Sequence, residues 1–365
     1  MPSSHAKPKR QRPRCWLAIV SLVTAGCGSV RDVDAPAEVH ADIASDDARA
    51  KVDPNVTIVP HPSWTCGLPD GIPSPALGKL AFVATFAVTS RRAVGATQFG
   101  QRELVVLGAG NVTGPRIEAT LQPGGFELPL TLQNGAVELE QLFVLRDGRG
   151  ASLLARTCGV AAPGGEVRIV VDLEAANDGP HAALQRATLV GTRALSADGT
   201  KLTLTVTDVT GVARTQPTVV IDNPPGVRDQ SWACKTLSGK RGAEMYRETV
   251  GIGTFLNVGV GKRGDRTIIP ITGGTMTGRI AGRVLPLGYD MPLFGARIVI
   301  DARYAMETDD GELVLVRNCG ALGALVPVFE AREAGRYAFV NEDEWLSSDP
   351  GIGFGSVSLQ IFERR

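Results

Sequence analysis

The chain contains the same sequence unit twice. Ser63-Trp64-Thr65-Cys66 recurs as Ser231-Trp232-Ala233-Cys234, and Arg156-Thr157-Cys158-Gly159 recurs as Arg317-Asn318-Cys319-Gly320. Self-similarity at a fixed spacing is the signature of one folding unit used more than once. The sequence therefore predicts two domains of one fold, and the polar positions at which the copies differ indicate which copy carries chemistry.

Further matched segments set the limits of the two units. Gly110–Gly114 aligns with Gly274–Gly278, and Leu128-Pro129-Leu130 aligns with Met291-Pro292-Leu293. We predict a first domain over residues 54–216 and a second over residues 217–365. Each is of the order of 150 residues, a common size for a single β-barrel or sandwich.

The N-terminal region resembles a bacterial lipoprotein signal. Five Lys and Arg residues precede the apolar run 15–23, which ends in Thr24-Ala25-Gly26-Cys27. The run is too short to span a membrane and has the layout of an export signal. We predict a signal peptide over residues 1–26 and a lipid anchor on Cys27, with plain secretion as the alternative. Gly28 lacks the acidic side chain associated with inner-membrane retention, so the expected location is the outer membrane, facing the periplasm or the surface.

The charge balance argues against nucleic acid as a partner. The whole chain has 38 basic and 38 acidic residues, and the predicted signal removes five basic and no acidic ones, which leaves a net charge of −5. No basic cluster remains outside the signal, as binding to phosphate backbones would need. Residues 27–53 are rich in Ala, Asp and Val and poor in aromatics, and we predict a flexible tether there, with a short helix near 35–49 as the alternative.

The rest of the chain reads as all-β. Gly and Pro recur between stretches in which apolar and polar residues alternate, as in Thr203-Leu204-Thr205-Val206. A period of two is typical of half-buried strands. Only the region 181–190 approaches the three- and four-residue spacing of a helix. We therefore predict two tandem antiparallel β-barrels.

Four cysteines occupy equivalent positions in the two units. Cys15 lies in the predicted signal and Cys27 takes the predicted lipid, so one pair remains in each copy. Export permits disulfides. We predict Cys66–Cys158 and Cys234–Cys319, with buried free thiols as the alternative.

The second unit carries an ordered set of segments that resembles a largely bacterial family, domain of unknown function 3237. These segments are Gly264–Gly274, Gly288-Tyr289-Asp290, Asp301–Tyr304 and Arg336–Asn341. The resemblance extends over about residues 245–365, with a degenerate copy over about 78–210. It implies an antiparallel β-barrel similar to the allene oxide cyclase, dirigent or lipocalin barrels. Phe339 stands where the family usually has Trp.

Known catalytic and cofactor motifs fit the sequence poorly. All four histidines lie outside the second unit, which argues against a nucleophile–histidine system and an imidazole-held zinc. Gly259–Gly264 matches G-x-G-x-x-G, but a strand follows where a phosphate loop needs a helix. Asp309-Asp310-Gly311 indicates a hairpin turn and lacks the ligand spacing of a calcium loop. We expect no cofactor and no metal.

The second copy keeps a polar set that the first has lost. Period two places Asp301 and Arg303 on one face of a strand, whereas the first copy has Glu140 and Leu142 at these positions. If that face is inward, the pair could bind a ligand; if outward, it is a surface ion pair. The candidate ligand-binding residues are Asp290, Asp301, Arg303, Tyr304, Tyr337 and Asn341.

The favoured function is that of an envelope lipoprotein whose second barrel binds a small molecule. One alternative is an isomerase, cyclase or hydrolase acting on a small carbonyl or apolar metabolite. The other is a structural or protein-interaction module. The sequence names no catalytic residue and leaves the choice between binding and catalysis open, although it favours binding.

Overall fold

The computed structural model describes residues 56–59, 68, 70–213, 218–220, 234–342 and 344–365. The predicted signal, Cys27, the tether 27–53, Cys66 and the predicted boundary near residue 216 lie outside these residues. Both barrels described below belong to one structural unit. Among the described residues, no helix is both long and apolar enough to cross a membrane.

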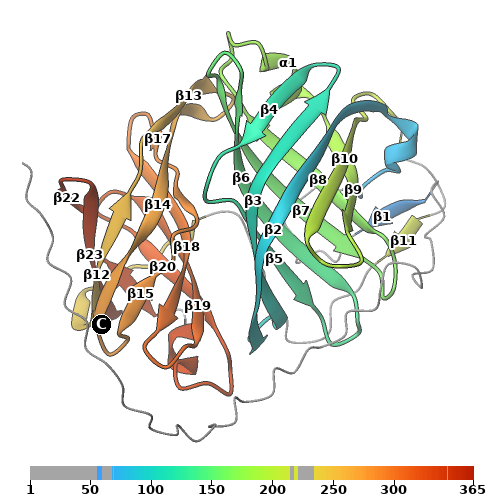
Figure 1. The fold of residues 1–365 in the computed structure, drawn as a ribbon. Helices are drawn as coiled ribbons and strands as arrows, with labels where there is room; N and C mark the ends of the chain where they lie inside the picture. The colour runs from blue at the N-terminus through green and yellow to red at the C-terminus, as the bar shows by residue number, and fades with distance from the viewer. Residues whose placement is uncertain (1–55, 60–67, 69, 214–217, 221–233, 343) are drawn as a thin grey trace, which may run out of the picture. The chain divides into compact units, whose positions relative to one another are not determined.

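The first repeat forms a closed sheet of nine antiparallel strands, drawn from blue to green in Figure 1. Pairing runs β2-β10-β9-β8-β7-β6-β4-β3, and β3 pairs again with β2, which leaves no free edge. The strands are β2 (Lys79–Thr97), β3 (Gly100–Gly114), β4 (Ile117–Leu121), β5 (Phe126–Thr131), β6 (Val137–Asp147), β7 (Ser152–Ala161), β8 (Val167–Glu174), β9 (Leu189–Leu195) and β10 (Lys201–Asp208).

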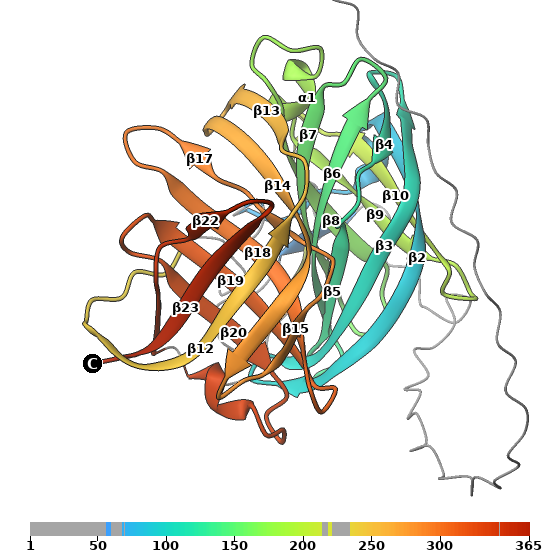
Figure 2. The same cartoon turned by 60° about the vertical axis from the view of Figure 1, so that its left-hand side comes forward.

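The second repeat forms a twelve-stranded antiparallel sheet, drawn from yellow to red in Figures 1 and 2. Its main path is β20-β19-β18-β15-β14-β12-β23-β21, and the Ser347 amide, in β21, donates to the carbonyl of Leu325, which precedes β20, across the closure. The strands are β12 (Arg241–Ile252), β13 (Leu256–Gly261), β14 (Gly264–Gly278), β15 (Gly282–Val284), β16 (Tyr289–Asp290), β17 (Leu293–Phe294), β18 (Val299–Thr308), β19 (Leu313–Ala321), β20 (Val326–Ala331), β21 (Trp345–Ser347), β22 (Gly351–Gly353) and β23 (Ser356–Arg364).

The remaining elements are short. Strands β1 (Thr57–Val59) and β11 (Thr218–Val220) form a parallel pair. A helix, α1 (Ala182–Arg186), lies in the one region with helical spacing, and two 3-10 turns are η2 (Pro75–Leu77) and η3 (Ala338–Asn341). The prediction of an all-β fold with two antiparallel barrels is therefore confirmed.

Two local predictions about turns are also correct. Residues Asp309–Gly311 join β18 to β19, with the Gly311 amide bonded to the Thr308 carbonyl and Gly311 at a φ of 84°. The G-x-G-x-x-G segment is the hairpin between β13 and β14. Glycine accepts the left-handed conformation at no steric cost, which explains its place in the first of these turns.

Strands at the contact between the barrels, such as β6 and β18, bury side chains on both of their faces. Each barrel has an interior cluster, one that includes Phe86 and Phe143 and one that includes Tyr246 and Phe329. A third cluster joins outward-facing residues of the two barrels, such as Leu142 and Ala305. Because both faces of β6 and β18 are buried, alternate residues along these strands point either into their own barrel or toward the other barrel. Neither face of these strands is turned to solvent.

Cysteine pairing follows the predicted pattern where the structure describes it. Cys234 and Cys319 form a disulfide with 5.2 Å between their Cα atoms. Cys158 is also in a disulfide, and its predicted partner Cys66 lies outside the described residues.

Candidate functional site

Asp301 and Arg303 lie on the outer face of β18, between the two barrels. Both side chains are buried, while Ile300, Ala302 and Tyr304 belong to the interior cluster. The sequence left two alternatives, an inward pair that binds a ligand and an outward pair on the surface, and neither describes the structure fully. The pair faces away from its own barrel, yet it is shielded from solvent because the first repeat covers it.

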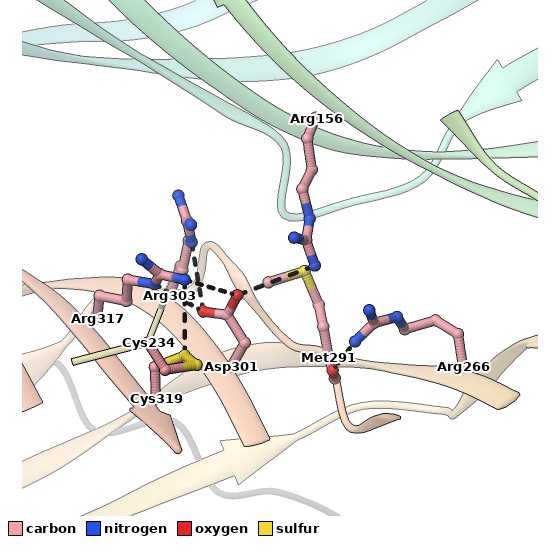
Figure 3. Close-up of a disulfide and its surroundings, with 8 residues drawn as sticks. All are labelled: Arg156, Cys234, Arg266, Met291, Asp301, Arg303, Arg317 and Cys319. Atoms are coloured by element: carbon pink, nitrogen blue, oxygen red, sulfur yellow. Dashed lines mark hydrogen bonds and ion pairs between the residues drawn. A yellow bond between two sulfur atoms is a disulfide. The ribbon is translucent and has the colours of Figure 1, made fainter. Parts of the chain in front are cut away.

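Asp301 is surrounded by guanidinium groups, as Figure 3 shows beside the Cys234–Cys319 disulfide. Arg317 donates from Nε and Nη2 at 3.0 and 3.2 Å, and Arg303 donates from Nε at 3.4 Å. Arg156 of the first repeat adds an ion pair at 3.9 Å. Burial raises the pKa of Asp301, but the three cations outweigh it and hold that pKa well below its usual value.

Arg303 connects the two repeats. Its Nη1 donates to Glu140 Oε2 at 2.9 Å. Glu140 lies opposite Cys158 in the sheet and Asp301 lies opposite Cys319, so Glu140 and Asp301 hold equivalent positions. The first copy lacks the arginine that would pair with Glu140, and the second copy supplies it across the interface.

A cavity of about 490 Å³ adjoins this network and is lined by both repeats. Its charged lining residues are Arg102, Glu140, Lys235, Arg303, Arg317 and Glu330. The apolar part of the wall includes Leu104, Phe126, Leu128, Leu315 and Val328. Volume and mixed lining match those of sites that hold small molecules. Asp301 and Tyr337 are not among its lining residues, although Arg303 and Tyr304 are.

Asp290 and Tyr304 belong to the interior of the second barrel. Asp290 pairs with Ala302 across the β16–β18 ladder, and directly paired residues share a face of a sheet. Because Ala302 and Tyr304 belong to the interior cluster, Asp290 faces inward with them. Burial and the nearby charge of Asp301 raise the pKa of Asp290 to about 7.

Glu248 is a further interior residue, on β12, that sequence reasoning missed. The Tyr304 hydroxyl donates to Glu248 Oε1 at 2.5 Å, and Tyr246 lies two positions earlier on the same inward face. Glu248 is 2% exposed, and burial raises its pKa to about 7 despite the hydrogen bond from Tyr304. A carboxyl group with such a pKa can donate and accept protons near neutral pH.

Tyr337 and Asn341 have structural roles in the region that follows β20. Asn341 exchanges two hydrogen bonds with the backbone of Ala331, at 2.8 and 2.9 Å. The Tyr337 hydroxyl donates to Asp310 Oδ1 at 3.1 Å, in the turn between β18 and β19. The six candidate residues thus divide between an interface, a barrel interior and these local contacts, and do not form one site.

The signal for Glu248 was present in the repeat. Glu248 pairs with Met276 and Ala84 pairs with Val112, at aligned positions of the two copies. An acidic residue on an inward stripe where the other copy has alanine marks a polar interior position.

Within the described residues, no group of three or more His, Cys, Asp or Glu side chains has the arrangement of a metal site.

Two tandem antiparallel β-barrels joined by a charged interface define the class of this protein. Residues 78–210 and 243–344 match the family described as protein of unknown function DUF3237. The two matches together cover more than half of the chain, so the chain belongs to this family.

Named relatives match a short stretch. A UPF0311 protein of Bradyrhizobium diazoefficiens is 45% identical over 78 residues, and one of Rhodopseudomonas palustris strain TIE-1 is 42% identical over 79 residues. Each alignment covers 21% of this chain and 51% or 52% of the relative. The chain thus spans about half the length of the curated relatives it matches.

Solved structures align with about a third of the chain. A protein of unknown function from Clostridium acetobutylicum is 17% identical, with a TM-score of 0.32, over 36% of this chain and 97% of its own. A β-barrel-like protein from Acinetobacter baumannii is 23% identical, with a TM-score of 0.30, over 33% of this chain and 94% of its own.

Proposed function

We propose that the protein binds a small anionic amphiphile in the cavity between its two barrels. The observation that carries the proposal is the composition of the cavity wall, in which four cationic and two anionic side chains adjoin an apolar surface. A carboxylate, sulfonate or phosphate would meet the cationic part, and an apolar body would rest on Leu104, Phe126 and Leu315. Guanidinium groups suit such acidic groups because they present several donors in one plane.

The second repeat contributes most of the cationic wall. Arg303, Arg317 and Lys235 come from it, and Arg102 comes from the first repeat. The first repeat has Leu142 where the second has Arg303, so the equivalent surface on the first barrel lacks this charge. This asymmetry supports the expectation that the second copy carries the binding function, although the site extends beyond that barrel.

We also propose that the protein acts in the bacterial envelope, where its predicted lipid anchor would hold it. The support is the order of basic residues, apolar run, small residues and Cys27. Replacement of Cys27 by alanine is expected to abolish incorporation of labelled fatty acid and to release the protein from membranes. Continued labelling of the Cys27→Ala variant would contradict this assignment.

The binding proposal is tested with 1-anilinonaphthalene-8-sulfonate, an anionic amphiphile, and with the uncharged N-phenyl-1-naphthylamine. We expect the sulfonate to bind more tightly. Leu128→Trp, which fills the cavity, should weaken it at least about 10-fold, and Lys235→Glu by roughly 3- to 10-fold, as expected for a charge at the edge of a site. Lys240→Glu changes an exposed lysine outside the cavity and should have no effect.

Unchanged sulfonate binding in Leu128→Trp would place the probe elsewhere and contradict the proposal. In that case a structural or protein-interaction role would be favoured, because the cavity would serve no ligand. Mass spectrometry of small molecules that co-purify with the wild-type protein, compared with Leu128→Trp, then identifies the natural ligand.

A further inference from the structure

Besides Asn318 and Tyr337, the interior of the second barrel contains two acidic residues and two further tyrosines. They are Tyr246, Glu248, Asp290 and Tyr304, and they come from strands β12, β16 and β18. Within the described part of the chain, neither Glu248 nor Asp290 makes an ion pair. Buried carboxyl groups are normally paired with cations or bound to metals, so this arrangement calls for an explanation.

Three polar atoms of this set are buried without a hydrogen-bond partner among the described residues. They are Glu248 Oε2, Asp290 Oδ1 and the Tyr246 hydroxyl, and the last of these lies close enough to the Tyr304 hydroxyl to interact with it without a hydrogen bond of good geometry. A well-formed hydrogen bond joins the Tyr304 hydroxyl to Glu248 Oε1. A buried polar atom that makes no hydrogen bond lowers stability. The set therefore destabilises the barrel in the state that the structure shows.

The first barrel shows that the fold does not need these polar groups. Gly114 lies against Phe82 in the first barrel, and its aligned residue Gly278 lies against Tyr246 in the second. In the same way, Phe143 pairs with Ala155 in the first barrel, and Tyr304 pairs with the aligned residue Val316 in the second. The counterparts of Tyr246, Glu248 and Tyr304 are thus Phe82, Ala84 and Phe143, and all three are buried in the interior cluster.

The fourth counterpart is neutralised in the first barrel. Asp290 aligns with Glu127, which accepts hydrogen bonds from Arg193 Nε at 3.2 Å and Nη2 at 2.5 Å. Gln141 also donates to Glu127, and Ala302 stands at the position of Gln141 in the second barrel. Gln141 Oε1 and Thr157 Oγ1 of the first barrel are also buried without a hydrogen-bond partner, but its interior carboxylate is paired with a cation, whereas the two interior carboxyl groups of the second barrel have no such partner among the described residues.

We infer that Tyr246, Glu248, Asp290 and Tyr304 form a second ligand site, inside the second barrel, for a small neutral molecule that carries a carbonyl or hydroxyl group. Such a group accepts from the Tyr246 hydroxyl or from a protonated carboxyl group, or donates to Glu248 Oε2. An anion is disfavoured because it would add a third acidic group to an interior without a paired cation. Of the four residues, only Tyr304 also lines the cavity between the barrels; Tyr246, Glu248 and Asp290 are not among its lining residues.

Three buried methionine side chains belong to the same interior cluster as the tyrosines of this polar set. Met276 lies directly opposite Glu248 in the β12–β14 ladder, and Met245 and Met306 belong to the same cluster. Unbranched thioether chains repack more readily than branched apolar ones. We expect the ligand to take the space of the methionine termini beside Glu248.

The first test uses the whole protein and needs no ligand. Tyr246→Phe removes a buried hydroxyl that makes no hydrogen bond of good geometry and restores the residue of the first repeat, so the melting temperature should rise by about 2 °C or more. Tyr337→Phe is the matched control, because it removes a hydroxyl that does have a partner, Asp310, and should not raise the melting temperature. A fall in the melting temperature of Tyr246→Phe would show a structural role and overturn the inference.

The second test follows methyl-labelled methionine by NMR during titration with cyclohexanone, cyclohexanol and cyclohexanecarboxylate. The two neutral probes should shift the Met276 methyl signal in the wild-type protein and in Leu128→Trp, whereas the carboxylate should not. Tyr246→Phe and Glu248→Gln should reduce the shift several-fold. Absence of a shift with both neutral probes, or an equal shift with the carboxylate, would overturn the inference. The response of Leu128→Trp separates this site from the cavity between the barrels.

Discussion

Arg102 and Arg266 occupy equivalent positions in the two repeats, and each pairs with a glutamate of the opposite barrel. Arg102 Nε donates to Glu330 Oε1 at 2.8 Å, and Arg266 Nε donates to Glu174 Oε2 at 2.9 Å. Each arginine also donates from Nη1 to a backbone carbonyl of its own barrel.

The two glutamates are equivalent as well. Glu174 pairs with Leu154, and Glu330 pairs with Leu315. These two leucines each lie four residues before the matched cysteine of their repeat. Reciprocal contacts of this kind are the mark of a two-fold interface. The two repeats therefore meet as the subunits of a symmetric dimer do, and the differences at Glu140, Leu142 and Arg303 are departures from that symmetry.

Breaking one of these reciprocal pairs should be costly. Arg266 and Glu174 have side chains that are 4% and 1% exposed, so Arg266→Met leaves an acidic group buried without its main partner. We expect a loss of roughly 3 to 5 kcal/mol in the free energy of unfolding, measured by urea denaturation. Arg247→Met is the control, because that ion pair is on the surface, and it should change stability by less than about 1 kcal/mol.

Asp301→Asn should change how the free energy of unfolding depends on pH below about pH 4. In the folded protein the pKa of Asp301 lies well below its usual 3.8. The folded carboxylate stays ionised where the unfolded one binds a proton, so its contribution is complete above about pH 4 and is lost as the pH falls further. The variant should be about 3 to 5 kcal/mol less stable at pH 7 and lose less between pH 4 and pH 2. Parallel curves for the two proteins would contradict this role for Asp301.

Glu248→Gln should change the dependence of stability on pH at higher pH, between about 4.5 and 7. The pKa of Glu248 rises from 4.5 to about 7 on folding, so between these values the unfolded chain releases a proton that the folded one keeps. Stability is therefore lost as the pH rises from about 4.5 to about 7, by an amount on the order of 3 kcal/mol. Thermal melts across this range should show a shallower fall in Glu248→Gln. Asp290→Asn removes the comparable contribution of Asp290 and serves as the parallel measurement.

The disulfide of the second repeat should stabilise it strongly. Cys234 and Cys319 are 85 residues apart, and closing a loop of that length is worth about 4 to 5 kcal/mol in chain entropy. Cys234→Ser paired with Cys319→Ser should lower the free energy of unfolding by up to this amount. Non-reducing peptide mapping should recover Cys234 joined to Cys319 and Cys66 joined to Cys158, and pairing between the repeats would be incompatible with two equivalent units.

The residues that could be assigned from the sequence are those governed by local patterns. Alternation with a period of two, turn residues such as Asp309–Gly311, and the repeated cysteine motifs predicted two all-β barrels and the Cys234–Cys319 bond. These features depend on residues close in the chain or on direct comparison of the two copies. For that reason the fold class and the family were readable before the structure.

The site depended on tertiary contacts that no local pattern contains. Alternation along β18 correctly places Asp301 and Arg303 on one face, but both faces of this strand are buried. The partner of Arg303 is Glu140, 163 residues away in the chain, and docking of the two repeats decides that it is there. Likewise, the lack of an ion pair to Glu248 among the described residues is a property of the closed barrel. The sequence by itself determines which side chains share a face, and only the tertiary structure determines what covers that face.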